Sequence, residues 1–281
     1  MKRFLLLTLM IAGLCGHATQ AVPPSAWQTL APGMELRVIT ARTPSPVGGS
    51  RITVLRIDPR LWDLVFAGIS QTGESDGLTA REWCDRRRFT AAINAGMFDM
   101  DYRTHTGYLR SLDHINSPRM RPYQSVAAFG PRAGKSLPRF RIFDLDSGGV
   151  SLGSIQKDYE LVVQNLRLIK RPGINQWGRQ EKKWSEAALG EDREGRILFI
   201  YSRSPFSMHD FNEELLASDI GIVAAQHLEG GSQAQMYLRA GRTEMELLGD
   251  YQSSSHAEGA GSTAWPVPNV LGIRPRLEPH P

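Results

Sequence analysis

Cysteine is almost absent from this sequence of 281 residues, which holds only Cys15 and Cys84. Cys15 lies in an N-terminal segment that we expect to be removed, so Cys84 has no partner in the mature chain and an intramolecular disulfide is excluded. Neither a nearby His nor a Gly-rich elbow accompanies Cys84. We therefore expect a buried, inert thiol rather than a nucleophile.

Long apolar runs are also missing beyond the N-terminus. Lys2 and Arg3 precede an apolar run over residues 4–15 that is too short to span a bilayer. Small residues at Thr19 and Ala21 complete the pattern of a secretory signal peptide over residues 1–21, a retained amphipathic anchor being the alternative. We expect a bacterial periplasmic or secreted protein without a transmembrane segment after cleavage.

No excess of charge marks the mature chain. Without Lys2 and Arg3, 31 basic residues face 29 acidic ones, and no basic stripe with interleaved aromatic residues is present. This excludes nucleic acid as the expected partner. No internal repeat or low-complexity tract divides the chain, and about 260 residues suit one domain.

Short β-rich runs dominate the sequence and most end in Gly, Pro, Asp or Ser. Two helices have clear starts, at the capping box Thr79 to Glu82 and at Ser207 to Asp210. In the second helix we expect Phe211 and Leu215 to pack on the sheet, with Asn212 and Glu214 facing water. The predicted class is α+β, a single domain with an extended mixed β-sheet system and a few packed helices. The predicted segments are 22–50 (N-terminal strand and linker), 51–273 (main domain) and 274–281 (tail).

A first group of polar residues follows the apolar strand predicted at 90–94. Asn94, Gly96, Phe98, Asp99 and Asp101 stand within eight positions, where a strand end presents polar groups to a cleft. Small residues permit close approach of a ligand, an aromatic ring stacks on a sugar, and carboxylates carry acid–base work or bind a cation. The alternative is an Asx-rich turn without function.

A second group lies between two strand-like runs late in the chain. Glu229 precedes Gly230, Gly231 and Ser232, and the Gly-Gly turn offers backbone N–H groups to an anion. The alternative is a hairpin whose glycines simply supply positive φ.

Together these groups resemble the paired motifs of the phosphodiester glycosidase family, many members of which are exported bacterial proteins linked to exopolysaccharide. Asn94-Ala95-Gly96-Met97-Phe98 is similar to that family's Asn-Gly-Gly-Phe-Phe block, and Leu228 to Gln233 resembles its Leu-Asp-Gly-Gly-x-Ser block. Gly107-Tyr108-Leu109 and the segment from Gln164 to Ile169 match two further motifs. The resemblance spans residues 51–273 and implies hydrolysis of a glycosyl phosphodiester or a related sugar linkage in envelope or extracellular glycans.

The resemblance implies roles for individual residues. Asp99 and Glu229 would be the catalytic carboxylates, and Asn94 would orient a sugar hydroxyl or a carboxylate. Substrate binding would fall to ten residues: Gly96, Phe98, His105, Gly107, Arg110, Gln164, Arg203, Gly230, Gly231 and Ser232. Asp99 and Asp101 offer oxygen ligands to Ca²⁺ or Mg²⁺, and no organic cofactor is expected.

Departures from the family pattern favour a second hypothesis. Glu229 stands where the family has Asp, Gln233 where it has Ser, and Ala95 where it has Gly. Trp184 to Gly190 lacks the Arg of the family's Arg-Thr-Ala-x-Gly run, which would leave phosphate binding to Lys182, Lys183 or Arg203. The alternative function is therefore a non-catalytic carbohydrate-binding or exopolysaccharide-assembly protein of the same fold. A serine hydrolase is discounted because no Gly-x-Ser-x-Gly elbow occurs.

Overall fold

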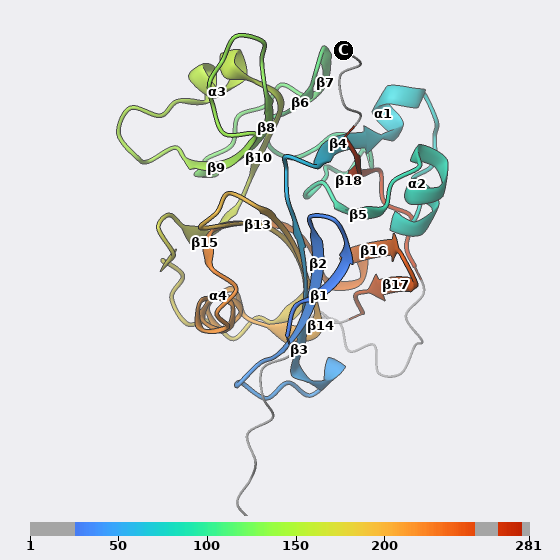
Figure 1. Ribbon diagram of the computed structural model, residues 1–281, viewed down its shortest axis with the longest axis vertical. Helices are drawn as coiled ribbons and strands as arrows, with labels where there is room; N and C mark the ends of the chain where they lie inside the picture. Colours follow the sequence, from blue (N-terminus) through green and yellow to red (C-terminus); the bar gives the residue numbers. More distant parts are fainter. Residues whose placement is uncertain (1–25, 251–263, 277–281) are drawn as a thin grey trace, which may run out of the picture.

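The computed structural model describes residues 26–250 and 264–276 (Figure 1). The predicted signal peptide and the end of the predicted tail lie outside the described residues.

An eight-stranded antiparallel sheet forms the centre of the molecule. Its strand order is β1-β2-β3-β14-β13-β15-β11-β12. The bounds are β1 Gln28–Ala31, β2 Met34–Thr40, β3 Arg51–Ile57, β11 Arg167–Lys170, β12 Ile174–Asn175, β13 Trp184–Asp192, β14 Ile197–Phe206 and β15 Ile222–Gly230. In Figure 1 the neighbouring strands β2, β3, β14, β13 and β15 curve around a ring.

Two five-stranded antiparallel sheets flank this centre. One has the order β7-β6-β10-β8-β9, with bounds β6 Leu109–Ser111, β7 His114–Ser117, β8 Ser125–Pro131, β9 Phe140–Asp144 and β10 Tyr159–Asn165. The other has the order β17-β16-β5-β18-β4, with bounds β4 Trp62–Gly68, β5 Ala91–Asn94, β16 Gln235–Ala240, β17 Thr243–Leu248 and β18 Asn269–Pro275. The predicted α+β class is confirmed. The sheets are antiparallel rather than mixed, because every strand pair runs antiparallel.

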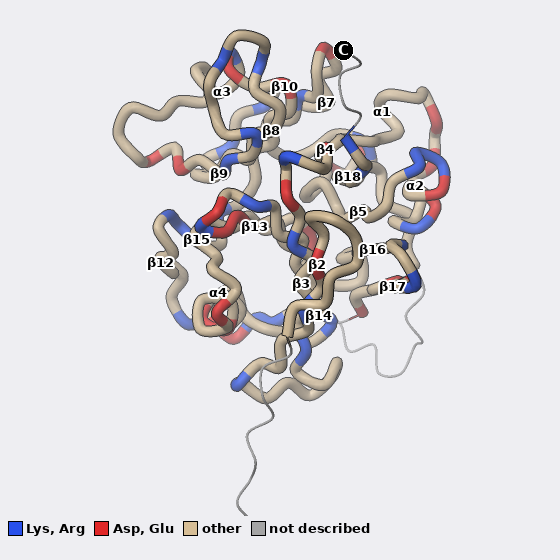
Figure 2. Tube along the Cα trace, in the orientation of Figure 1, with Lys and Arg blue, Asp and Glu red and all other residues tan. Residues whose placement is uncertain are grey.

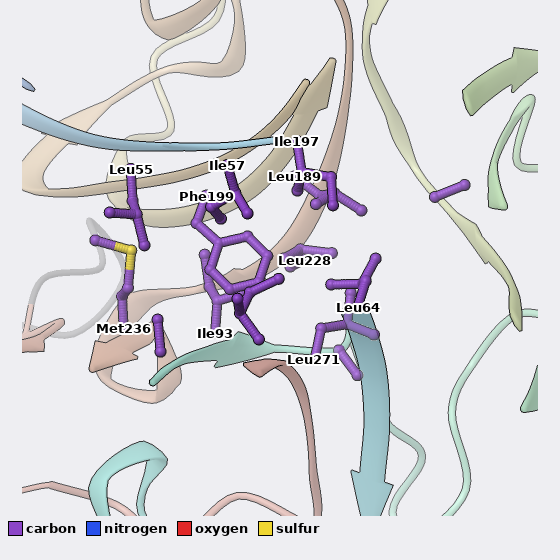
Figure 3. Close-up of a cluster of buried hydrophobic side chains, with 14 of the residues drawn as sticks. Leu55, Ile57, Leu64, Ile93, Leu189, Ile197, Phe199, Leu228, Met236 and Leu271 are labelled. Atoms are coloured by element: carbon purple, nitrogen blue, oxygen red, sulfur yellow. The ribbon is translucent and has the colours of Figure 1, made fainter. Parts of the chain in front are cut away.

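One hydrophobic core joins all three sheets. Figure 3 shows side chains of the central sheet, including Leu55 and Phe199, meeting Ile93 and Leu271 of a flanking sheet, and Leu161 of the other flanking sheet is buried in the same cluster. Strand β14 explains how the layers are built. Ile197 and Phe199 point into this core, whereas Leu198 and Ile200 belong to a second cluster on the opposite face, as the two-residue repeat of a strand requires.

Helices cover the outer faces of the sheets. The short α1 spans Ile69–Thr72, α2 Ala80–Arg87, α3 Leu152–Asp158 and α4 Met208–Ala217, with 3-10 turns η1 Gly48–Ser50 and η2 Gly231–Gln233. The predicted capping box is present, because the Glu82 backbone N–H donates to Thr79 Oγ1 and the Thr79 N–H donates to Glu82 Oε2. Cys84 of α2 is buried as expected, and burial raises the pKa of its thiol.

The expected orientation of α4 is wrong at two positions. Asn212 and Glu214 are buried rather than solvated. Asn212 Nδ2 donates to the Leu168 carbonyl at 2.8 Å, and the Glu214 carboxylate accepts from the backbone N–H groups of Arg42 and Thr43, each at 2.9 Å. Polar side chains are buried here because backbone groups of neighbouring segments satisfy them, which the helical period does not reveal.

Segment bounds differ slightly from those expected. Strands β1 and β2 pair into the central sheet through β3, so residues 28–40 are part of the main structure. Strand β18 continues to Pro275, where it pairs with Trp62. Within the part of the chain that the structure describes, no helix is long and apolar enough to cross a membrane.

Candidate active site

The ends of three strands and the start of a fourth meet at one place. Asn165, the last residue of β10, donates from Nδ2 to the carbonyl of Ala95, which follows β5. The next residue, Leu166, accepts a 2.8 Å hydrogen bond from the backbone N–H of His227 on β15. Strand β13 pairs with β15 so that Glu186 lies opposite Gly230. The two motif blocks, distant in sequence, therefore converge through β10.

Asn94 fixes the turn in which the second motif block ends. Its Oδ1 accepts from the Gln235 backbone N–H at 2.7 Å, and its Nδ2 donates to the Gln233 carbonyl at 3.0 Å. The side chain is buried, so these bonds hold η2 and the start of β16 against the end of β5. This placement gives Asn94 a positioning role next to Gly230 and Gly231.

Gly96, His105 and Asn165 form a buried polar cluster. Gly96 has φ of +148°, and a Cβ there would lie 2.2 Å from His105 Nε2 and 2.4 Å from Asn165 Oδ1. His105 Nε2 lies 3.1 Å from Asn165 Oδ1, while the Gly107 N–H donates to His105 Nδ1. His105 Nδ1 also lies 3.0 Å from the Gly107 carbonyl oxygen, so both ring nitrogens make polar contacts. Burial lowers the pKa of His105, in agreement with a neutral ring.

Gln164 joins the Gly107 segment to the loop after β7. The fully buried side chain accepts from the Arg121 N–H at 3.0 Å and from the Tyr108 N–H at 3.3 Å. Its Nε2 donates to the carbonyls of Arg121 and Tyr123 at 2.8 and 2.9 Å. Gly107 makes this packing possible, because a Cβ would lie 2.4 Å from the Gln164 carbonyl oxygen.

Replacing Gln164 by Leu is expected to lower the free energy of unfolding by about 3 kcal/mol, because four backbone groups lose their partner. The melting temperature should fall by about 10 °C. Thermal denaturation followed by circular dichroism measures this. The matched control is Gln124→Leu, since Gln124 is half-buried and makes one bond of 3.4 Å to the Pro122 carbonyl. Equal melting temperatures of the two variants would contradict the role given to Gln164.

Glu229 is a buried carboxylic acid at the end of β15. Its Oε1 accepts from the Gly230 N–H at 3.0 Å. Burial raises the pKa of Glu229 to about 7; His227 and the Gly230 N–H lower it, and the charge of Glu186 adds to the increase. A carboxyl group that changes charge near neutral pH suits proton transfer.

Beside Glu229 lies a buried pair that joins β13 to β15. His227 Nδ1 lies 2.5 Å from Glu186 Oε1, and Trp184 Nε1 donates to Glu186 Oε2 at 2.7 Å. Burial alone lowers the pKa of His227, but the charge and hydrogen bond of Glu186, together with Glu229, raise it above its ordinary value. The pair is therefore an imidazolium–carboxylate ion pair under mildly acidic conditions. Gly230 accommodates the Trp184 ring, which a Cβ would meet at 2.7 Å.

Asp99 and Asp101 have different partners and do not converge. Asp99 forms an ion pair with Arg119, and Arg121 Nη2 lies 3.9 Å from Asp99 Oδ1. Asp101 accepts from the Thr104 hydroxyl and from the backbone N–H groups of Arg103 and Thr104, and these bonds lower its pKa, the Thr104 hydroxyl most. Among residues 26–250 and 264–276, no group of three or more His, Cys, Asp or Glu side chains could hold a metal ion. The cation stays a prediction.

Phe98 and Tyr102 form the aromatic part of the site. Their rings meet edge to face with centroids 4.9 Å apart, and the Tyr102 hydroxyl donates to the Pro266 carbonyl. Burial, and then the charge of Glu229, raise the pKa of Tyr102. The loop over residues 97–105 is thus within electrostatic range of Glu229.

The remaining predicted binding residues are placed less favourably. Arg110 donates to the carbonyls of Gln156 and Tyr159, which commits its guanidinium to the end of α3. Arg203 forms an ion pair with Asp250. Ser232 is exposed on η2, and Gly231 has φ of +68°. A cavity of about 510 Å³ elsewhere is lined by none of the predicted site residues.

Reasoning from the sequence missed Glu186, Arg119 and Arg121, and it gave His227 no role. Glu186 lies in the segment from Trp184 to Gly190. From the sequence, this segment was distinguished only by lacking the Arg of the family pattern. An ionisable residue inside an otherwise buried strand, Ser185 to Asp192, was the available signal. Arg119 and Arg121 flank the exposed Met120 in a loop. Their spacing is not distinctive, so the sequence offered no signal for them.

Solved structures of other proteins share the fold. The fold aligns with the catalytic domain of zebrafish N-acetylglucosamine-1-phosphodiester alpha-N-acetylglucosaminidase, described as auto-inhibited by its pro-peptide, at a TM-score of 0.63 and 14% identity, over 90% of this chain and 87% of that one. A hypothetical protein from Synechocystis aligns at a TM-score of 0.54 and 15% identity, over 91% of this chain and 64% of that one. No curated protein matches the sequence.

Fold and motifs together define a domain with a hydrolase-like fold of the phosphodiester glycosidase type. The family model of the phosphodiester glycosidases matches residues 87–274, which include both motif blocks and the strands that bring them together. The chain belongs to the phosphodiester glycosidase family, as its motifs indicate.

Proposed function

We propose that this protein is an exported hydrolase that releases a sugar from a glycosyl phosphodiester or a related linkage. The observation that carries the proposal is Glu229, a buried carboxyl group with a pKa of about 7 in the late motif of the family. In its protonated form such a group donates a proton to the departing oxygen while oxocarbenium character develops on the sugar. A periplasmic or secreted location and an exopolysaccharide substrate are part of the proposal and rest on the N-terminal pattern and the family.

The neighbouring groups have defined tasks in this reaction. Glu186 and His227 hold charge near Glu229, and their charges shift its pKa in opposite directions, Glu186 upward and His227 downward. Phe98 offers a ring to the sugar, and the backbone at Gly231 offers an N–H donor. Asp99 is less suited to proton transfer than Glu229, because Arg119 already forms an ion pair with it.

The test is release of reducing sugar from a panel of sugar-1-phosphodiesters, including one of N-acetylglucosamine, by the chain from residue 22 onward. Release by this protein supports the hydrolase. The control is the Glu229→Gln variant prepared in the same way. No release from any substrate, combined with retention on glycan arrays, would reject the hydrolase in favour of a binding protein.

One observation favours that second candidate, a non-catalytic carbohydrate-binding protein of the same fold. Asn94, His105 and Gln164, which the resemblance assigns to catalysis or substrate binding, are buried and make their hydrogen bonds to other groups of the protein. Residues of this kind preserve the shape of a site without requiring turnover.

The proposed role of Glu229 predicts a pH dependence. Because the protonated form is the active one, kcat should be constant at acidic pH and fall as pH rises through about 7, the pKa of Glu229. A rate profile from pH 5 to about 9 measures this. Activity that increases steadily across this range would show that Glu229 acts as a base or not at all.

A further inference from the structure

The loop after β7 carries two arginines close to Asp99, which follows the motif block from Asn94 to Phe98. Arg119 and Arg121 flank Met120, and their side chains are 54% and 44% exposed. Both approach the single carboxylate of Asp99, whose side chain is 23% exposed. Two exposed guanidinium groups therefore lie at the surface of the site beside Asp99, and Arg119 is also within electrostatic range of Asp101. Elsewhere Lys and Arg are interspersed with Asp and Glu, and the view in Figure 2 shows no face of one sign.

Arg121 is held in place by contacts that leave the end of its side chain free. Buried Gln164 bonds both the N–H and the carbonyl of Arg121, and Arg121 Nε donates to the Thr106 carbonyl at 3.0 Å. The 3.9 Å from Arg121 Nη2 to Asp99 is too long for a hydrogen bond. Among the residues that the structure describes, the terminal nitrogens of Arg121 make no hydrogen bond. A fixed guanidinium with free N–H groups suits the paired oxygens of a phosphate.

Arg110 and Arg203, two of the other candidates for phosphate, have contacts elsewhere in the protein. Arg110 binds two carbonyls at the end of α3, and Arg203 is paired with Asp250. Strand β13, where the family pattern has an Arg, carries Glu186 in this chain, and a buried carboxylate repels a phosphate.

Contacts connect the loop of Asp99 to the turn that follows Glu229. Asp99 belongs to the loop over residues 97–105, in which the Tyr102 N–H donates to the Asp99 carbonyl at 2.9 Å. The Tyr102 hydroxyl bonds the Pro266 carbonyl, and the neighbouring Trp265 carbonyl accepts from Gln235, which Asn94 ties to the Gly-Gly turn. A ligand phosphate at the arginines would thus lie beside the loop whose Tyr102 is within electrostatic range of Glu229.

We propose that Arg119 and Arg121 form the phosphate-binding site of this protein, with Asp99 and Gln164 as the residues that position them. The ligand class is a phosphate monoester or diester of a sugar. Only this choice of ligand rests on the proposed function, because the site itself is defined by the two arginines and their partners.

Calorimetric titration with inorganic phosphate and with glucose 1-phosphate tests the site directly. Arg119→Ala and Arg121→Ala should each weaken binding about tenfold, the cost of one charge-assisted hydrogen bond, and the double variant should not bind. Binding should weaken between about 0.01 M and about 0.15 M ionic strength, since the groups are exposed. Arg121→Lys should be intermediate, because Lys keeps the charge but not the fork.

The matched control is Arg239→Ala. Arg239 on β16 is 48% exposed and paired with Asp85 and Glu244, so its removal changes the net charge equally at another place. Unchanged phosphate binding in Arg239→Ala, with losses in the other two, supports the site. Equal loss in all three variants, wild-type affinity in the Arg119 and Arg121 variants, or no binding by the wild type at millimolar phosphate would each overturn it.

The result of the phosphate-binding test can be distinguished from the result of the sugar-release test. Phosphate binding through the two arginines without sugar release from any phosphodiester would support the site and reject hydrolysis. Sugar release that Arg119→Ala and Arg121→Ala leave unchanged would keep the hydrolase and reject the site.

Discussion

Replacing Glu229 by Gln is expected to lower kcat for sugar release by about 10³-fold, the usual contribution of a positioned proton donor. The amide keeps the size of the side chain and an oxygen that can accept from the Gly230 N–H, but it has no proton to give. The remaining activity should also lose its decline above pH 7. The measurement is the rate of release of reducing sugar as a function of pH, beside the exposed Glu181→Gln as control.

The stability of the Glu229→Gln variant against denaturant distinguishes loss of the proton donor from misfolding. Because the pKa of Glu229 is raised from 4.5 to about 7 in the folded protein, the folded state retains a proton that the unfolded state releases. The wild type therefore loses stability as pH rises from about 4.5 to about 7. Glu229→Gln has no such group, so at pH 8 it should unfold at a denaturant concentration at least as high as the wild type. An inactive variant that also unfolds more easily at that pH would leave Glu229 with a structural role.

Replacing His227 by Leu is expected to lower the free energy of unfolding by about 4 kcal/mol near pH 6, because it leaves the Glu186 carboxylate buried without its charged partner. The double variant Glu186→Leu, His227→Leu should be less destabilised than the sum of the single changes, since no unpaired charge remains. Urea denaturation of the four proteins gives this coupling. Additive effects would show that the two side chains do not act as a pair.

The pH dependence of this coupling has a definite sign. The pKa of His227 is raised in the folded protein, so the stability contributed by its protonation is complete below about pH 6.5, its ordinary pKa. That contribution is lost as pH rises through the folded pKa. The difference between the wild type and His227→Leu should therefore be smaller at pH 9 than at pH 6. A difference that grows with pH would contradict an imidazolium–carboxylate pair.

If both predictions hold, the site differs from the family pattern in a specific way. Glu186 lies in the segment that lacks the Arg of the family pattern, and its charge partner is His227 on the neighbouring strand. The positive charge toward a phosphate would then come from the loop of Arg119 and Arg121 on another sheet.

Local features of the sequence predicted many elements correctly. The β-rich runs, the capping box at Thr79 and Glu82, and the Ser207 cap were confirmed because each depends on neighbouring residues. The burial of Asn212 and Glu214 was missed because their partners, Leu168 and the backbone at Arg42 and Thr43, are far away in sequence. A helical period shows which side chains are apolar, but not which polar groups a distant segment satisfies.

The sequence by itself determined the α+β class, the motif blocks at Asn94 and Glu229, and the phosphodiester glycosidase family. Tertiary structure alone decided which charged groups meet. Glu186 contacts His227 because β13 pairs with β15, and Arg119 contacts Asp99 because Gln164 holds the loop after β7 against β10. Charge interactions depend on distance and burial rather than on order along the chain, and only the folded chain sets those two quantities.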